Sequence, residues 1–190
     1  MIFLDTNIWY NYFASLEKTT SQIKKNFLKN QREALEIVKL IKEGKVECCI
    51  TNFALMEIYS VIKTVLINSK LLYDGFLPGE FGRAKAETDI QLPKESTGFL
   101  NNFVYEEIKN MCKFDDVEID YNFLNRFLKK CGLDVSDAVL LYQANKMGCE
   151  YFITTDNNII KTAEKLKNLK KPKLKIKAIK PKEFLPKHSI

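Results

Sequence analysis

The stretch Met1-Ile2-Phe3-Leu4-Asp5-Thr6-Asn7-Ile8-Trp9 decides the fold class. Its apolar residues run directly into a carboxylate, a hydroxyl and an amide, and apolar residues then resume. A continuous apolar run without polar alternation predicts a strand that is buried on both faces. Because α/β sheets bind their ligands just beyond the carboxyl ends of such strands, Asp5 is the first candidate for chemistry. The alternative is that Asp5 or Thr6 only caps the following helix.

Length and composition indicate one intracellular domain. A chain of 190 residues is long enough to bury a substantial core. No window reaches the roughly 18 uncharged apolar residues of a membrane span, and Asp5 interrupts any signal-peptide pattern. We therefore expect a soluble, cytoplasmic protein without a membrane partner. Its 5 cysteines have no C-x-x-C spacing and are interpreted as small buried hydrophobes.

Charge is distributed unevenly along the chain. The whole sequence carries a formal net charge of +6. The C-terminal segment 161–190 is strongly basic, whereas residues 1–160 contain more acidic than basic side chains. This asymmetry suits a protein that holds cations in its body and meets a polyanion nearby.

Apolar and amphipathic segments alternate along the rest of the chain. Strands are expected at 46–51, 117–121, 151–155 and 173–179, in addition to the first one. Helices are expected at 7–14, 31–43, 53–72 (capped by Asn52), 99–112, up to Gly132, from Asp134 or Ser136 to Gly148, and at 157–169. Strands that alternate with helices predict an α/β fold, a three-layer α/β/α sandwich around a mostly parallel sheet, in a single domain over 1–190.

Two segments stand apart from this alternation. Residues 73–97 contain several glycines and prolines among mixed charges, which predicts an insertion or flap. In the last strand, Lys173, Lys175 and Lys177 alternate with apolar residues. They either contact RNA or, as lysines on an edge strand commonly do, protect the sheet edge and keep the protein soluble.

Four carboxylates occupy conspicuous positions. Asp5 and Asp156 each follow a predicted strand, Asp137 lies in the first turn of a helix, and Glu57 interrupts an apolar helix. Each has an ordinary explanation, since Asp5 and Asp156 can cap helices and Asp137 can form a capping pair with Asp134. Glu57 can reach solvent, although its helical neighbours are apolar and a buried carboxylate without a partner is costly.

Taken together, the acids predict a metal site. If the first, second and fourth strands are neighbours in a parallel sheet, the ends that carry these acids lie side by side. Converging carboxylates repel unless they are neutralised, and hard divalent cations such as Mg²⁺ prefer oxygen ligands. A water on such a cation can attack a phosphodiester.

Other catalytic classes lack their residues. The single histidine, His188, is third from the end of the sequence, which argues against histidine-based nucleases, hydrolase triads and zinc–histidine sites. The sequence contains neither a phosphate-binding G-x-x-x-x-G-K-[ST] loop nor a G-x-G-x-x-G turn after a strand. Of the catalytic classes considered, metal-assisted chemistry on phosphate is the one whose residues the sequence contains.

An ordered set of motifs resembles the PIN-domain ribonuclease family. The motifs are FLDTNIW at 3–9, Glu57 in the helix after the second strand, Ser136-Asp137-Ala138 with Ala144 downstream, and Phe152-Ile153-Thr154-Thr155-Asp156. The resemblance covers about 160 residues. It implies a compact α/β/α fold and a Mg²⁺- or Mn²⁺-dependent endoribonuclease activity.

The resemblance also implies roles for single residues and for partners. Asp5, Glu57, Asp137 and Asp156 match the family's metal-binding acids, and Asn7 and Thr154 match its supporting polar positions, with Thr6 as a further candidate. Many such microbial proteins are VapC-type toxins that form homodimers and are inhibited by a small antitoxin. This chain is longer than the compact toxins, and Asp134 competes with Asp137 as a ligand.

Two other hypotheses remain beside the nuclease. One is a non-catalytic RNA-binding or assembly module that keeps the fold. The other is a haloacid-dehalogenase-like phosphatase, which also begins with an Asp at the end of a strand. Such phosphatases require a second Asp two residues later, where this chain has Asn7.

Overall fold

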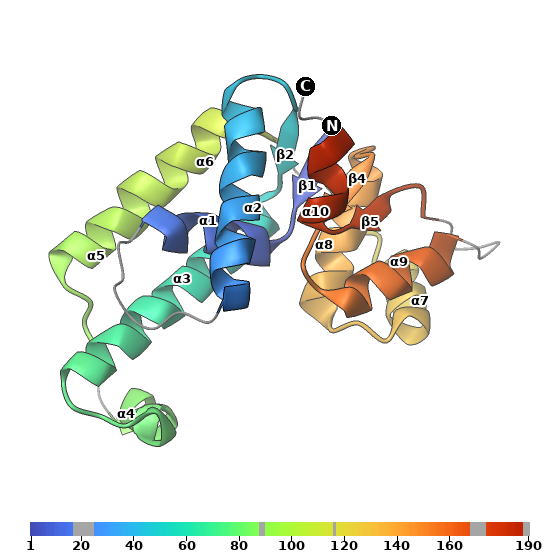
Figure 1. The fold of residues 1–190 in the computed structure, drawn as a ribbon. Helices are drawn as coiled ribbons and strands as arrows, with labels where there is room; N and C mark the ends of the chain where they lie inside the picture. Colours follow the sequence, from blue (N-terminus) through green and yellow to red (C-terminus); the bar gives the residue numbers. More distant parts are fainter. Residues whose placement is uncertain (17–24, 88–89, 116, 168–173, 188–190) are drawn as a thin grey trace.

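Five short parallel strands form the central sheet, in the order β3-β2-β1-β4-β5. Figure 1 labels β2, β1, β4 and β5. The computed structural model describes residues 1–16, 25–87, 90–115, 117–167 and 174–187. The strands are β1 Ile2–Leu4, β2 Cys48–Ile50, β3 Cys112–Phe114, β4 Tyr151–Ile153 and β5 Lys177–Ile179. The first, second and fourth strands are neighbours, as the sequence argument required.

Helices connect and cover the strands. Their bounds are α1 Thr6–Leu16, α2 Lys25–Lys42, α3 Asn52–Tyr73, α4 Phe81–Glu87, α5 Lys94–Gly98, α6 Tyr105–Met111, α7 Tyr121–Cys131, α8 Val135–Lys146, α9 Asn157–Lys167 and α10 Pro181–Phe184. Short 3-10 turns lie at Pro78–Glu80 and Leu185–Lys187, and a π-helical stretch lies at Phe99–Val104. Within the described ranges, none of the helices is both long and apolar enough to cross a membrane.

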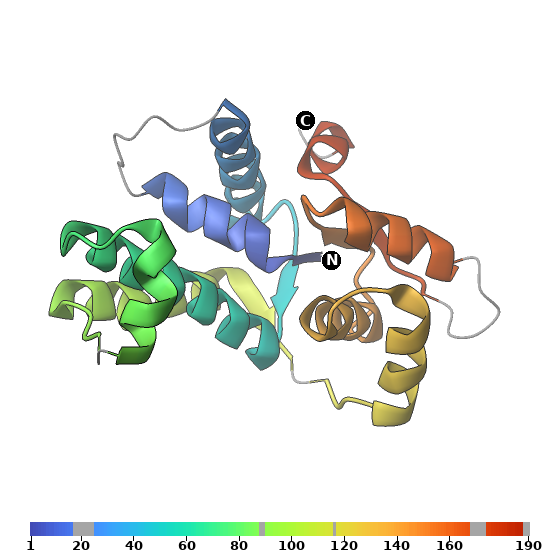
Figure 2. The same ribbon diagram turned by 90° about the horizontal axis from the view of Figure 1, so that it is seen from below.

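The strand order places helices on both faces of the sheet. The chain runs outward from β1 to β2 and β3, then crosses back past β1 to β4 and β5. Because connections between parallel strands are right-handed, the two directions put their helices on opposite faces. Figure 2 shows α1, α2, α3 and α6 on one side of the sheet and α7, α8 and α9 on the other. The result is the three-layer α/β/α fold expected from the sequence.

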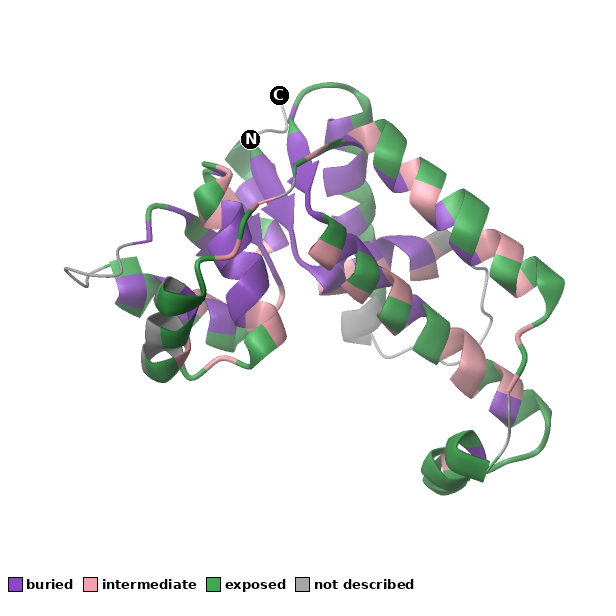
Figure 3. Ribbon diagram, turned by 180° about the vertical axis from the view of Figure 1, so that it is seen from behind, coloured by how far each residue is buried: buried purple, intermediate pink, exposed green. Residues whose placement is uncertain are grey.

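The core lies between these layers. All three residues of β1 are buried, and Phe3 stacks on Phe152 of β4 with ring centroids 5.7 Å apart. Figure 3 shows that burial concentrates in the sheet and the helix faces against it. The continuous apolar run of the first strand therefore reflects burial on both faces.

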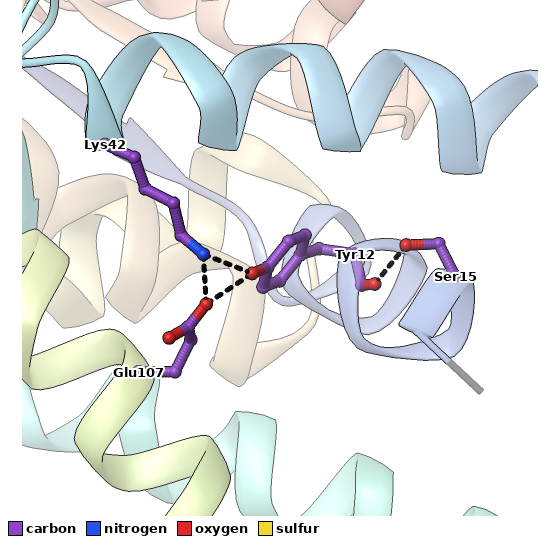
Figure 4. Close-up of polar contacts among 4 residues, drawn as sticks. All are labelled: Tyr12, Ser15, Lys42 and Glu107. Carbon is purple, nitrogen blue, oxygen red and sulfur yellow. Dashed lines mark hydrogen bonds and ion pairs between the residues drawn. The ribbon is translucent and has the colours of Figure 1, made fainter.

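A polar contact joins three helices on one face (Figure 4). The hydroxyl of Tyr12 on α1 donates to Glu107 Oε1 on α6 over 2.5 Å and accepts from Lys42 Nζ on α2 over 3.0 Å. Lys42 also forms an ion pair with Glu107. These partly buried side chains tie α1, which begins beside Asp5, to its neighbouring helices.

The strand predicted at 117–121 is wrong. The third strand is β3 at Cys112–Phe114, and residues 117–120 form no regular structure. The sequence predicts a helix through residue 112, because a three-residue strand directly after a helix has almost no periodicity of its own. The backbone carbonyl of Asp120 instead accepts from Leu124 N and begins α7.

Other boundaries also differ from the sequence expectations. The helix predicted at 31–43 begins at Lys25, and α3 is capped by Thr51, whose hydroxyl accepts from Ala54 N, and not by Asn52. The segment 73–97, expected to be a flap without regular period, contains α4 and the start of α5. The last strand covers only Lys177–Ile179 of the range 173–179, because Lys175 N and Ile176 N donate to the side chain of Asn145.

Candidate functional site

The site lies at the carboxyl edge of the sheet, between β1 and β4. From β1 the chain turns toward β2, and from β4 it turns toward β5, so these strands flank the switch point of the topology. Ligands of open α/β sheets bind in the crevice outside the strand ends at this point. Asp5 follows β1, Thr154 follows β4, and Asp5 N donates to Ile153 O over 3.0 Å.

Asp5 is the most buried acid of the site, and the residue is only 3% exposed. Its Oδ2 accepts from Thr154 Oγ1 over 2.5 Å and from Asn7 Nδ2, and Asn7 Nδ2 also donates to Thr154 Oγ1 over 3.1 Å. The pKa of Asp5 is raised to about 7, chiefly by burial and also by the charges of Asp137 and Glu57, while the hydrogen bond from Thr154 opposes the rise. The carboxyl group is held firmly yet is costly to ionise alone.

Glu57 reaches the site from α3. Thr6 Oγ1, in the first turn of α1, donates to Glu57 Oε2 over 2.5 Å. Burial raises the pKa of Glu57, the hydrogen bond from Thr6 lowers it, and the charge of Asp134 raises it. Glu57 is half-buried and turned toward the other acids, so its position differs from that of an acid at a solvent boundary.

Asp134 and Asp137 begin α8. Asp134 is the N-cap of this helix, and its Oδ1 accepts from Asp137 N over 2.9 Å. Burial raises the pKa of Asp137 to about 6, together with the charges of Asp134, Asp156 and Glu57. The capping role therefore falls to the exposed Asp134, and the side chain of Asp137 remains available to the site.

Asp156 begins α9 and takes part in its cap. Its Oδ1 accepts from Asn158 N over 2.6 Å, and its own backbone N donates to Thr154 Oγ1 over 2.9 Å. The hydroxyl of Thr154 thus joins Asp156 to Asp5. Asp156 therefore caps α9, and its charge also raises the pKa of Asp137. A helix cap and a candidate metal ligand are both compatible with its position.

The arrangement gathers negative charge at the carboxyl edge of the sheet. The charges that shift the pKa values of Asp5, Glu57 and Asp137 are all carboxylates. Within the described part of the chain, no three His, Cys, Asp or Glu side chains are close enough, as placed, to bind one ion together. Mg²⁺ usually keeps several waters and is held by one or two carboxylates. A donor set made only of oxygen fits this hydrated mode of binding.

Sequence reasoning missed a buried pair that positions two of these acids. Thr51 follows β2 at the same sheet edge, and its hydroxyl donates to Gln143 Oε1 on α8 over 2.8 Å. The same hydroxyl caps α3. One residue therefore sets α3, which carries Glu57, against α8, which carries Asp137. The sequence does predict a cap at the start of α3, but it points to Asn52 and not to Thr51.

The predicted lysine row lies elsewhere. Lys177 is the first residue of β5 and pairs with Tyr151 at the amino edge of the sheet, and Lys175 precedes it. The acids lie at the carboxyl edge. Lys173 lies outside the described residues.

Comparison with known proteins supports the fold. No family model matches the sequence, and the search of curated proteins gave no match. A solved structure titled "Crystal structure of PAE2754 from Pyrobaculum aerophilum" is similar, with a TM-score of 0.50 and 12% sequence identity. The likeness covers 99% of this chain and 96% of that one. At this identity it shows a shared fold over the whole length.

Proposed function

We propose that this protein is a metal-dependent endoribonuclease of the PIN type, which hydrolyses RNA phosphodiester bonds at the carboxyl edge of its sheet. The observation that carries the proposal is that the Thr154 hydroxyl, at the switch point between β1 and β4, joins Asp5 to Asp156, with Glu57 and Asp137 near enough to raise the pKa of Asp5. Acids that are wholly or partly buried and that raise one another's pKa are suited to neutralise a divalent cation. The motif order described above supports the same activity.

Each residue has a role in this reaction. Asp5, Asp137 and Asp156 would hold Mg²⁺ or Mn²⁺, which supplies a water of lowered pKa and offsets the charge that develops on the phosphate. Thr154 and Asn7 hold Asp5 in place through their hydrogen bonds. Glu57, which accepts a hydrogen bond from Thr6, would orient the attacking water and accept its proton. In-line attack on phosphorus would break the bond to the 3′-oxygen, which takes up a proton from solvent, and would leave a 5′-phosphate and a 3′-hydroxyl.

The test is cleavage of a labelled RNA pool by the purified chain with Mn²⁺, Mg²⁺ or EDTA. We expect cleavage with either metal, none in EDTA, and a loss of at least 100-fold in Asp5→Asn and Asp137→Asn. Asp74→Asn, at the exposed end of α3, is the matched control and should cleave as the wild type does. RNA binding without cleavage would favour the non-catalytic module, and hydrolysis of small phosphate esters would favour the phosphatase.

The resemblance also leads us to propose a homodimer and a toxin role with a small antitoxin. Light scattering of the purified chain tests the dimer. Co-expression with the product of any short adjoining reading frame tests inhibition, and growth arrest that this product relieves is the expected result. A monomer that does not affect growth would leave a nuclease outside any toxin–antitoxin pair.

A further inference from the structure

A hollow of about 270 Å³ lies beside the acids, between α2, the turn after β4 and the segment after β5. Three lysines line it, Lys29, Lys180 and Lys182, together with Thr155 and Glu33. Lys29 Nζ lies 3.8 Å from Glu33 Oε1, so the positive charge of Lys29 is partly offset. The hollow nevertheless keeps an excess of positive charge directly next to a site of negative charge.

The strand register explains how Lys180 comes to this edge. Leu4 pairs with Ile153, and Ile153 pairs with Ile179. The next residue of each strand is therefore Asp5, Thr154 and Lys180, and their backbones remain aligned, since Thr154 N donates to Ile179 O over 3.0 Å. Two strand spacings put the backbone of Lys180 roughly 10 Å from that of Asp5.

Thr155 connects the hollow to the acids. It lies between Thr154, which binds Asp5, and Asp156, and its backbone N donates to Asn7 Oδ1 over 3.3 Å. The wall of the hollow and the support of Asp5 therefore belong to one turn. A ligand that contacts both a cation held by the acids and the lysines of the hollow would carry separated negative charges along a chain, as a polynucleotide does.

We propose that the hollow between Lys29, Thr155, Lys180 and Lys182 binds a phosphate of single-stranded RNA next to the phosphate that is cleaved. This inference rests on the proposed function and adds a direction to it, because RNA would then run along the carboxyl edge of the sheet from β1 past β4 toward β5. Lysine binds phosphate as a point charge, and each contact releases condensed counterions. The subsite therefore predicts salt-dependent affinity that these lysines control.

The test measures binding of a fluorescent single-stranded RNA in EDTA at several salt concentrations, on the Asp5→Asn background. Lys180→Ala/Lys182→Ala should weaken binding about tenfold and reduce the slope of log K against log salt by about 1.4, for two lost contacts. The control is Lys109→Ala/Lys113→Ala at the β3 edge, which removes the same charge and should change affinity less than twofold.

The outcomes separate the subsite from the nuclease. Equal losses in both double variants would mean binding by net charge and would overturn the subsite. A loss confined to Lys175→Ala/Lys177→Ala would move RNA to the amino edge and would also overturn it. If wild-type protein cleaves no RNA but Lys180→Ala/Lys182→Ala still loses affinity and slope, the subsite stands and the nuclease proposal fails.

A second, independent observation concerns two cysteines. Cys49 on β2 and Cys149, just before β4, have Sγ atoms 2.8 Å apart, although 100 residues separate them. Both are free thiols and both are buried. The gap is only about 0.8 Å longer than a disulfide bond. Since β1 lies between β2 and β4, a bond here would fix the strand that carries Asp5 between its neighbours.

We infer that Cys49 and Cys149 form a disulfide when the chain meets a low-molecular-weight disulfide, R–S–S–R. The Cys149 thiolate attacks one sulfur, forms a mixed disulfide and releases RS⁻. The Cys49 thiol then passes its proton to RS⁻, and its sulfur attacks Cys149 Sγ and releases the second RS⁻, which takes up the proton lost from Cys149. Two protein thiols are oxidised and R–S–S–R is reduced to two RSH. The hydrogen bond with Cys49 lowers the pKa of Cys149, which suits it to the first attack.

The experiment oxidises the folded chain with glutathione disulfide, both directly and during refolding from urea so that buried thiols are reached. We expect two of the 5 thiols to disappear, a peptide pair that joins Cys49 to Cys149, and a Tm higher by roughly 5–15 °C. Cys149→Ser should abolish all three effects, and Cys112→Ser should keep them. Retention of all thiols after oxidative refolding, or a link between Cys48 and Cys112 instead, would overturn the inference.

Discussion

Thr154 Oγ1 donates a hydrogen bond of 2.5 Å to Asp5 Oδ2, across 149 residues of sequence. The same oxygen accepts from the backbone N of Asp156 over 2.9 Å. One buried hydroxyl thus joins the acid that follows β1 to the acid that follows β4. It fixes two of the proposed metal ligands relative to each other, although it has no charge and would not itself need to bind the ion.

Thr154→Val tests this hydroxyl. The variant keeps the shape of the side chain but removes the donor to Asp5 and the acceptor for Asp156 N. We expect RNA cleavage to fall 10- to 100-fold, as on loss of other groups that support metal ligands, and stability to fall by about 1–3 kcal/mol. Cleavage rates and urea unfolding measure the two effects. Thr64→Val, on the exposed face of α3, should change neither, and unchanged cleavage in Thr154→Val would remove the hydroxyl from the mechanism.

The pH dependence of stability in EDTA tests the burial of Asp5. Its pKa is about 7 in the folded chain against an ordinary value of 3.8. An acid that binds its proton more tightly when folded stabilises the fold at low pH, and this contribution is lost as the pH rises from about 4 to about 7. Urea unfolding should therefore show wild type losing stability relative to Asp5→Asn across this range. A constant difference between the two proteins would contradict the raised pKa.

Thr51→Val tests the link between α3 and α8. The variant removes the cap of α3 and leaves Gln143 Oε1 buried without its donor. We expect a loss of about 1–3 kcal/mol in unfolding free energy. Cleavage should also fall, because Glu57 and Asp137 are carried by the two helices. Thr64→Val, on the exposed face of α3, is the matched control. Full activity in a destabilised Thr51→Val would mean that the link serves stability alone.

Tyr12→Phe separates stability from activity. Its hydroxyl bridges Glu107 and Lys42, and the ion pair between these two remains after the change. We expect a loss of about 1 kcal/mol, measured by urea unfolding, with unchanged RNA cleavage. A large loss of cleavage would show that α1 depends on this contact to hold Asp5 and Asn7.

Much of the fold was predictable because its signals are local. The apolar runs before Asp5 and Thr154 are buried strands, and their residue types alone indicate this. The third strand was not predictable in the same way, since Cys112–Phe114 is three residues long and directly follows a helix. The predicted edge strand was longer than β5. The backbone N–H groups of residues 175 and 176 donate to the side chain of Asn145 on α8, and not to a neighbouring strand.

The sequence indicated the candidate acids better than it indicated the residues that hold them in place. Strand ends and helix starts mark Asp5, Asp137 and Asp156 in the sequence. The pairing of Thr51 with Gln143 joins residues from separate elements, and no local pattern indicates it. The position of Lys180 beside the acids depends on the strand order, since only the order β1-β4-β5 brings it there.

The central claim is that the acids between β1 and β4 hold a divalent cation, and calorimetric titration of Mn²⁺ into the chelator-treated chain tests it most directly. The account predicts saturable binding by the wild type at pH 8, at least tenfold weaker binding by Asp5→Asn and by Asp137→Asn, and unchanged binding by Asp74→Asn. Absence of binding by the wild type, or equal binding by all four proteins, would contradict it.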